Sequence, residues 1–164
     1  MTDTQHQIVR GYVPGMIGDI VRLHADYYYP QWGLGRSLEA DIAKGLGSFM
    51  LRHDERLDGI WTVSQQGQVQ VAIVIDGSGE AVGEARLRFF IASDALRGQG
   101  VGRKLMQTAI DFCDEKRFAR VYLKTLACLE SACHLYAAFG FVVTRDEWVD
   151  GLHELFYDRL RTWS

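Results

Sequence analysis

The stretch Arg97-Gly98-Gln99-Gly100-Val101-Gly102-Arg103-Lys104 decides the fold, because it joins two segments of different kinds. Residues 84–93 before it read as a strand, and the apolar positions after it recur at helical spacing, namely Val101, Leu105, Ala109 and Phe112. Glycines let a backbone approach a ligand closely, and the first N–H groups of a helix have no partner within it. The stretch therefore predicts a cradle for an anion, with a phosphate as the natural guest.

Three basic side chains in this stretch, Arg97, Arg103 and Lys104, strengthen the prediction. A cation near a helix N-terminus opposes the helix dipole by about 0.3–1 kcal/mol, and an anionic ligand reverses that penalty. The alternative is a tight turn in which the glycines serve geometry and the basic residues serve solubility.

The spacing also narrows the kind of phosphate ligand. A P-loop needs GxxxxGK followed by Ser or Thr, and neither Gly98 nor Gly100 has such a pair at that distance. A dinucleotide fold needs a third glycine where Arg103 stands, and an acidic residue about twenty positions on, whereas the residues near Tyr122 are not acidic. Both nucleoside triphosphate hydrolysis and NAD binding are disfavoured.

Outward from this stretch, the hydrophobic patterns predict one α/β domain over residues 1–164. The elements expected in order are a strand at 6–13, a helix from 16 to about 29, a loop at 30–35, a helix that Ser37 caps, a hairpin of 59–63 and 69–75, the strand at 84–93, a helix from Val101, a strand at 120–126, a helix at 129–136, and strands at 141–143 and 152–157. This order predicts a mixed, mainly antiparallel sheet of six to seven strands with helices on both faces. The crossover helix should make strands 84–93 and 120–126 parallel.

Composition limits the classes of function. The chain has 164 residues, 48% of them hydrophobic, and a formal net charge of -3, which predicts one soluble core and no general binding to nucleic acid or to an anionic membrane. Its apolar runs are far shorter than the roughly 20 residues of a membrane span, and its start lacks a secretory signal, so we expect a cytoplasmic protein. The cysteines at 113, 128 and 133 lack metal-like spacing, so we expect core residues and no metal.

The sequence resembles the GNAT acyltransferases, a family of N-acetyltransferases. Arg97, Gly100 and Gly102 match the family signature of Arg or Gln, two residues, Gly, one residue, and Gly or Ala. Leu135-Tyr136 followed by Gly140-Phe141 resembles the family's later motif, and the element order agrees over nearly the whole chain. A looser similarity links residues 24–32 and 131–136 to the acetyltransferase halves of MarR-type regulator fusions, although the chain has no room for the DNA-binding half.

The resemblance implies acetyl-CoA (coenzyme A) as cofactor, with its pyrophosphate on the backbone of residues 99–104. The pantetheine arm would pair with the open edge of the Phe90-Ile91-Ala92 strand as a missing neighbour strand does. Where the family often carries Asn, this chain has Leu129, and Ser131 is expected to supply the polar contact instead. The residues expected at the cofactor are Phe90, Ile91, Ala92, Arg97, Gly98, Gln99, Gly100, Val101, Gly102, Arg103, Lys104 and Ser131.

The resemblance also implies that Tyr136 donates a proton to the departing thiolate; the alternative is a core aromatic that packs on Phe141. Glu84 is the nearest acidic candidate for the general base, with His24 and His134 as alternatives that could act through water. Glu84 could instead be a solvated residue after a turn.

Acceptor recognition is expected, by resemblance, from the first two helices and the loop between them. His24, Tyr28 and Trp32 belong to an unusually aromatic segment, and aromatic side chains with an acidic residue suit an amine near an apolar group. The alternative is that Tyr28 and Trp32 seal the core.

The reaction expected is acetyl transfer to a primary amine, either a small molecule or a protein amino group. Two other functions stay open: a non-catalytic acyl-CoA sensor of the same fold, and a domain for another phosphate ligand. Trp148 and His153 could line the far wall of the site or pair with a second subunit in a homodimer.

Overall fold

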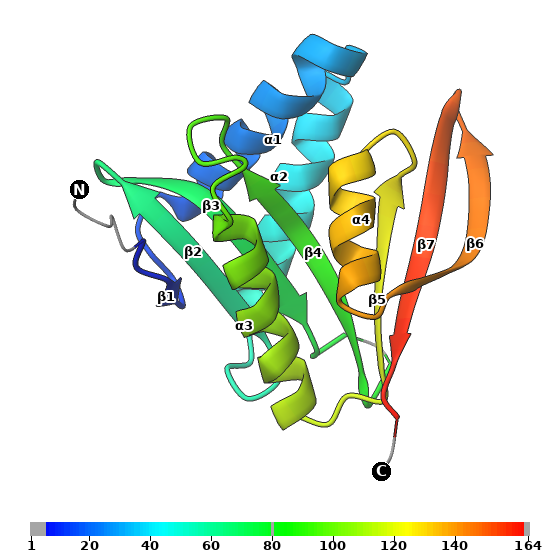
Figure 1. Cartoon of the computed structure of the whole chain (residues 1–164). Coiled ribbons are helices and arrows are strands. Elements are labelled where there is room, and N and C mark those ends of the chain that lie inside the picture. The colour runs from blue at the N-terminus through cyan, green and yellow to red at the C-terminus, as the bar shows by residue number, and fades with distance from the viewer. Residues whose placement is uncertain (1–5, 80, 163–164) are drawn as a thin grey trace.

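The computed structural model describes residues 6–79 and 81–162, in which a seven-stranded sheet carries four helices (Figure 1). The strands are β1 (Val9–Arg10), β2 (Gly59–Gln65), β3 (Gln68–Asp76), β4 (Glu84–Ala92), β5 (Arg120–Leu126), β6 (Val142–Val149) and β7 (Leu152–Leu160). The helices are α1 (Met16–Trp32), α2 (Arg36–Leu51), α3 (Val101–Glu115) and α4 (Glu130–Ala138). The expected element order and mixed α/β class are confirmed.

The strands follow the order β1-β2-β3-β4-β5-β7-β6, and only β4 and β5 run parallel. The crossover through α3 gives this parallel pair, as expected. The two strands pair only from Glu84↔Arg120 to Arg86↔Tyr122. Beyond that point they separate, and Figure 1 shows β4 and β5 diverging between the two halves of the sheet.

Each face of the sheet has its own core. Met16 and Ile20 of α1 and Leu46 and Phe49 of α2 are fully buried against β2, β3 and β4. On the opposite face α3 and α4 cover a second cluster that includes Leu105. Burial of each such large apolar side chain contributes about 1.5–3 kcal/mol, so both helical layers hold the sheet firmly beside the opening.

Both tight hairpins follow from their turn residues. Gln66 and Gly67 have φ values of 52° and 75°, and Asp150 and Gly151 have values of 49° and 79°. Two successive residues with positive φ make the two-residue turn that matches strand twist. The last two strands are longer than expected, because β6 and β7 pair from this turn back to Val142 and Asp158.

Three local predictions are wrong. The first strand is only two residues long, because Gly11, with φ 101°, ends it. Helix α1 continues through Pro30, although the proline has no N–H to donate, and ends at Trp32 before Gly33. Helix α2 begins at Arg36 after Gly35, so Ser37 is not its cap.

No helix in the described part of the chain has the length and apolar character needed to cross a membrane. Cys113 is buried in the second core, as expected, whereas Cys128 is exposed just after β5, so the expectation that it lies in the core is wrong.

Candidate active site

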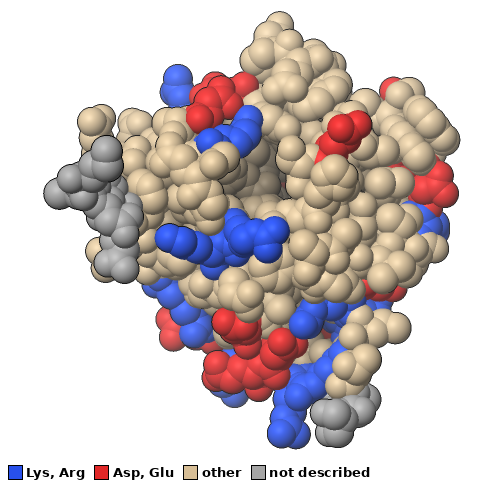
Figure 2. Space-filling model, viewed as in Figure 1, with Lys and Arg blue, Asp and Glu red and all other residues tan. Residues whose placement is uncertain are grey.

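The separation of β4 from β5 opens a cleft of about 1070 Å³ between the two halves of the sheet. Side chains from α1 and α2 form one wall, α4 and β5 form the other, and the turn before α3 lies at the mouth. Figure 2 shows basic side chains beside a hollow in this face, over the start of α3. The hydrogen-bonding edge of β4 faces this space without a neighbouring strand beyond Arg86.

The turn before α3 is shaped by glycines. Gly98 and Gly100 have φ values of 79° and 78°, which side chains other than glycine rarely adopt. The first hydrogen bond of α3 runs from the Lys104 N–H to the Gly100 carbonyl, at 3.2 Å. The N–H groups at 101–103 therefore have no acceptor within the helix and are available to an anion.

Gly102 brings the helix close to the open strand. A Cβ atom at this position would lie 3.3 Å from the Phe90 ring, so even alanine would push against that side chain. Phe90, Ile91 and Ala92 all line the cleft. Phe89 has φ 52° at an irregularity in the β3–β4 register, and such a bulge bends a strand.

The basic side chains of the turn have separate roles. Arg97 donates to the Asp94 carboxylate at 2.8 Å and to the Ala92 carbonyl, and lies 4.3 Å from the ring centre of Tyr27. It therefore ties the turn to α1 and to the end of β4. Arg103 also lines the cleft, with its guanidinium 5.6 Å from the ring centre of Phe139.

Three other members of the predicted cofactor set contribute differently. The Gln99 side chain donates to the Ala95 carbonyl at 2.8 Å and so stabilises the turn itself. The Val101 side chain is buried in the core under α3, which leaves only its backbone for a ligand. Lys104 is exposed on α3 outside the cleft lining, whereas Ser131 and Leu129 do line the cleft on the α4 side.

Tyr136 is held at the inner end of the cleft by the way α4 ends. Gly140 has φ 90°, the Phe141 N–H donates to the Tyr136 carbonyl at 3.1 Å, and the Gly140 N–H donates to the Ala137 carbonyl at 3.1 Å. These two bonds form a Schellman motif, and the Tyr136 and Phe141 rings make its usual apolar contact. Burial raises the pKa of Tyr136, and nearby Tyr28 and Cys133 add to the rise, so the phenol is protonated at neutral pH.

Glu84, the residue predicted to act as the general base, lies at the paired end of β4 and β5. Its carboxylate accepts a hydrogen bond from Arg120 at 3.1 Å, where β4 and β5 are still paired, and it does not line the cleft. Six residues separate it from Phe90, which is about 20 Å along an extended strand. Arg120 also binds Asp158 at 2.8 Å, so Glu84 belongs to an ion-pair network at the closed end of the sheet.

His24 is the histidine that the structure brings into the cleft wall. Its side chain is 4% exposed, lies edge-on to Phe89 and stacks on Tyr28. Nδ1 lies 2.8 Å from the Ile20 carbonyl, which can only accept, so Nδ1 carries the hydrogen and Nε2 carries a lone pair. Burial lowers the pKa of His24 from 6.5, which keeps the ring neutral at pH 7. His134 also lines the cleft, but it is exposed on α4.

The aromatic segment of residues 24–32 lies entirely on the last turns of α1, although the sequence predicts a loop from residue 30. Tyr28 and Trp32 are four residues apart on the helix, so their rings meet, with centres 5.8 Å apart, and both line the cleft. Tyr27 contacts both rings. Burial raises the pKa of Tyr28 to about 12. The structure therefore brings His24, Tyr28 and Trp32 together as one wall.

Several charged residues that line the cleft are not predicted from the sequence: Asp41, Arg86, Arg88, Lys124, Asp150 and Glu154. The strand pattern could have indicated two of them. Arg86 and Arg88 alternate with buried Ala85 and Leu87 and so share the opposite face of β4. The described residues contain no group of three or more His, Cys, Asp or Glu side chains that could hold a metal ion.

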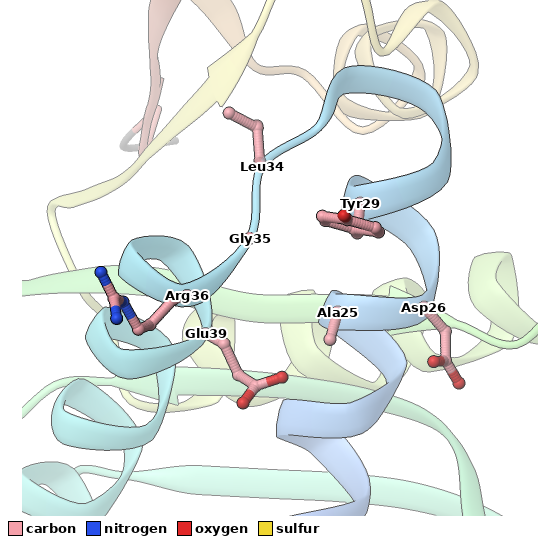
Figure 3. A pocket seen from close by; sticks show the side chains of 7 residues that line it. All are labelled: Ala25, Asp26, Tyr29, Leu34, Gly35, Arg36 and Glu39. Atoms are coloured by element: carbon pink, nitrogen blue, oxygen red, sulfur yellow. The ribbon is translucent and has the colours of Figure 1, made fainter.

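A second, smaller crevice of about 320 Å³ lies between the end of α1 and the start of α2 (Figure 3). Asp26, Tyr29 and Glu39 line it, and the Arg36 side chain points away from α1. The ring of Tyr29 packs on Gly35 beside this crevice. Because the crevice is smaller and open, the larger cleft is the better candidate for an active site.

The cleft and its glycine turn agree with a known family. Residues 17–141 match the profile of the Acetyltransferase (GNAT) family. This chain belongs to the GNAT family. It is also similar to a crystal structure of an acetyltransferase from Streptococcus agalactiae, with a TM-score of 0.74 and 18% identity over 96% of this chain and 99% of that one. That likeness shows the shared fold.

Two curated relatives align with parts of this GNAT chain. The uncharacterized N-acetyltransferase YjgM of Escherichia coli is 33% identical over 84 residues, which is 49% of each chain. N-acetyltransferase 8 of Rattus norvegicus is 25% identical over 120 residues, which is 71% of this chain and 53% of the relative. The chain thus spans about half the length of the curated relatives it matches.

Proposed function

We propose that this GNAT chain transfers an acetyl group from acetyl-CoA to a primary amine. The observation that carries the proposal is the free N–H array at the start of α3 beside the unpaired edge of β4. An array of this kind suits a pyrophosphate, and an open strand edge suits the amides of a pantetheine arm. Both features fit one elongated ligand, because the Gly102 contact brings the helix against the strand.

The residues that would hold acetyl-CoA are the backbone of the turn, the edge of Phe90, Ile91 and Ala92, and the side chains of Arg103 and Ser131. Bound there, the cofactor would supply the acetyl thioester that the amine attacks. Arg97 holds the turn in shape from within, since its guanidinium is already engaged by Asp94 and Ala92.

Tyr136 is proposed as the proton donor to the departing thiolate. A phenol near pKa 10 protonating the thiolate of a thiol near 8.5 is uphill by about 2 kcal/mol in water. Burial raises the pKa of Tyr136 further, but burial disfavours the thiolate as well, which offsets part of this rise. The phenol stays protonated and ready to donate over the whole neutral range.

His24 is proposed to accept a proton from the amine, which is the role predicted from the sequence for Glu84. Its Nε2 has no hydrogen-bond partner among the described residues and is not sealed from the cleft. Since Nδ1–H is held by the Ile20 carbonyl, the ring has the tautomer in which Nε2 can take a proton directly or through water.

Release of free CoA in the presence of amines tests the proposal, with the Tyr136→Phe variant as the decisive comparison. This substitution keeps the contacts with Phe90, Phe141 and Tyr157 and removes only the hydroxyl. We expect unchanged acetyl-CoA affinity and a kcat lowered about a hundredfold or more.

Three outcomes would contradict the proposed function or its mechanism. Unchanged kcat in Tyr136→Phe would remove Tyr136 from the mechanism. Tight binding of acetyl-CoA without CoA release for any amine would favour the sensor function, and competition by simple nucleotides would favour another phosphate ligand. The acceptor, the single-domain organisation over 1–164, the cytoplasmic location and the homodimer remain predictions from sequence.

A further inference from the structure

The cleft contains a basic side chain that has no acidic partner. Arg86 lies on β4 in the last residue pair before β4 and β5 separate, and it lines the cleft half-buried. Its guanidinium makes no hydrogen bond or ion pair with any described residue. A partly buried charge of this kind is costly unless something compensates it.

The acidic side chain opposite Arg86 already has other basic partners. Asp76 stands opposite Arg86 in the β3–β4 register, but its carboxylate accepts hydrogen bonds from Arg52 at 2.9 Å and from Arg88 at 3.0 Å. On β5, Lys124 lies 3.7 Å from Glu154. Arg88 and Lys124 thus have partners, whereas burial and the adjacent Arg88 both lower the pKa of Arg86. An added anion would relieve this unfavourable environment.

Arg86 faces the side of the sheet away from the cofactor cradle. Ala85 and Leu87 on either side of it point into the core beneath α3, so the alternation along β4 directs Arg86 to the α1–α2 side. The anion cradle lies at the start of α3, on the other side. A ligand at Arg86 is therefore part of the acceptor and not of the cofactor.

We propose that Arg86 binds a carboxylate of the acceptor, which makes the acceptor an amino acid or a similar small amine with a carboxylate. This inference rests on the proposed function, because it assigns the anion to the molecule that is acetylated. Arg86 and the bulge at Phe89 are three residues apart, about 10 Å along the strand, and the arginine side chain shortens that gap. Tyr28, Trp32 and Phe89 form an apolar wall for the rest of the acceptor.

The test compares acetylated amino acids with their uncharged amides by calorimetry, using CoA-saturated protein. The ligands are the N-acetyl derivatives of phenylalanine, leucine and methionine, each with its carboxamide. A guanidinium–carboxylate pair is bidentate, so we expect the acids to bind about tenfold to a hundredfold more tightly than the amides. Arg86→Gln should abolish the difference, and Arg86→Lys should restore part of it.

The matched control is Arg22→Gln, which removes the same charge from an α1 side chain that is 79% exposed and does not line the cleft. It should leave the preference for acids unchanged. Equal affinity for acids and amides, binding of neither, or a preference that survives Arg86→Gln would each overturn the proposal.

Failure of this inference can be told apart from failure of the proposed function. CoA release with phenylalanine, phenylalaninamide and phenethylamine at rates that Arg86→Gln does not alter would leave acetyl transfer standing and remove the carboxylate site. An Arg86-dependent preference in calorimetry without CoA release from any amine would leave the carboxylate site standing and contradict acetyl transfer.

Discussion

The two sides of the cleft are built from different parts of the chain. On the α3 side, backbone N–H groups and an unpaired strand edge form the surface of the cleft, and Gly98, Gly100 and Gly102 shape it. On the α1–α2 side, the surface consists of side chains such as His24 and Arg86. A backbone surface can recur in many sequences that keep the glycines, whereas a side-chain surface changes with each substitution. The comparison explains why the family can be identified from a short motif and the acceptor cannot.

The largest effect is expected from breaking the backbone side. Gly100→Asp with Gly102→Asp should weaken acetyl-CoA binding by more than a hundredfold in calorimetry. Gly100 has φ 78°, a Cβ at 102 would crowd Phe90, and two carboxylates would repel a pyrophosphate. Hydrogen bonds to charged groups contribute about 1.5–3 kcal/mol each, so the loss of two suffices for this change.

A matched double variant separates the site from the charge. Gly18→Asp with Gly47→Asp adds the same two carboxylates on α1 and α2, where a Cβ meets no atom within 4 Å and φ is not positive. Acetyl-CoA affinity should be unchanged in this control. Equal loss in both double variants would mean that net charge, and not the turn, determines binding.

An intermediate effect is expected on the side-chain side from His24→Asn. The amide can still donate to the Ile20 carbonyl but has no basic nitrogen in place of Nε2. We expect kcat to fall about a hundredfold with acetyl-CoA affinity unchanged. Because burial places the pKa of His24 below 6.5, the kcat of the native protein should be level above pH 6.5 and fall as pH drops through that lowered value.

The pH profile decides which histidine is the base. In His24→Asn the acidic limb should disappear along with most of the rate. If His134→Asn removes that limb while His24→Asn retains it, the proton acceptor is the exposed histidine of α4 and the proposed role of His24 is wrong.

The contrast between the backbone side and the side-chain side of the cleft also determines what could be predicted from the sequence. The glycine turn and Tyr136 follow from local spacing, because positive φ values and the end of α4 are encoded within a few residues. The surroundings of Glu84 could not be predicted, since they depend on where two strands distant in sequence stop pairing. Trp32 is predicted to lie in a connection because Pro30 suggests a helix end, although its spacing of eight residues from His24 fits one helical face. The unpaired state of Arg86 among the described residues could not be predicted, because it depends on which carboxylates already bind other basic side chains.

The smallest effect is expected at the closed end of the sheet, from Glu84→Gln. Glu84 and Arg120 are each about one third exposed, and Arg120 keeps its hydrogen bond to Asp158 when the Glu84 carboxylate is lost. Ion pairs at this degree of exposure contribute about 1 kcal/mol or less, so the unfolding free energy in urea should fall by no more than that. The kcat for amine acetylation should stay within about twofold, whereas loss of a general base would cost about a hundredfold to ten-thousandfold. A loss of that size in a variant with native stability would restore Glu84 to the mechanism. It would also mean that a carboxylate already engaged by Arg120, outside the lining of the cleft, takes up a proton during the reaction.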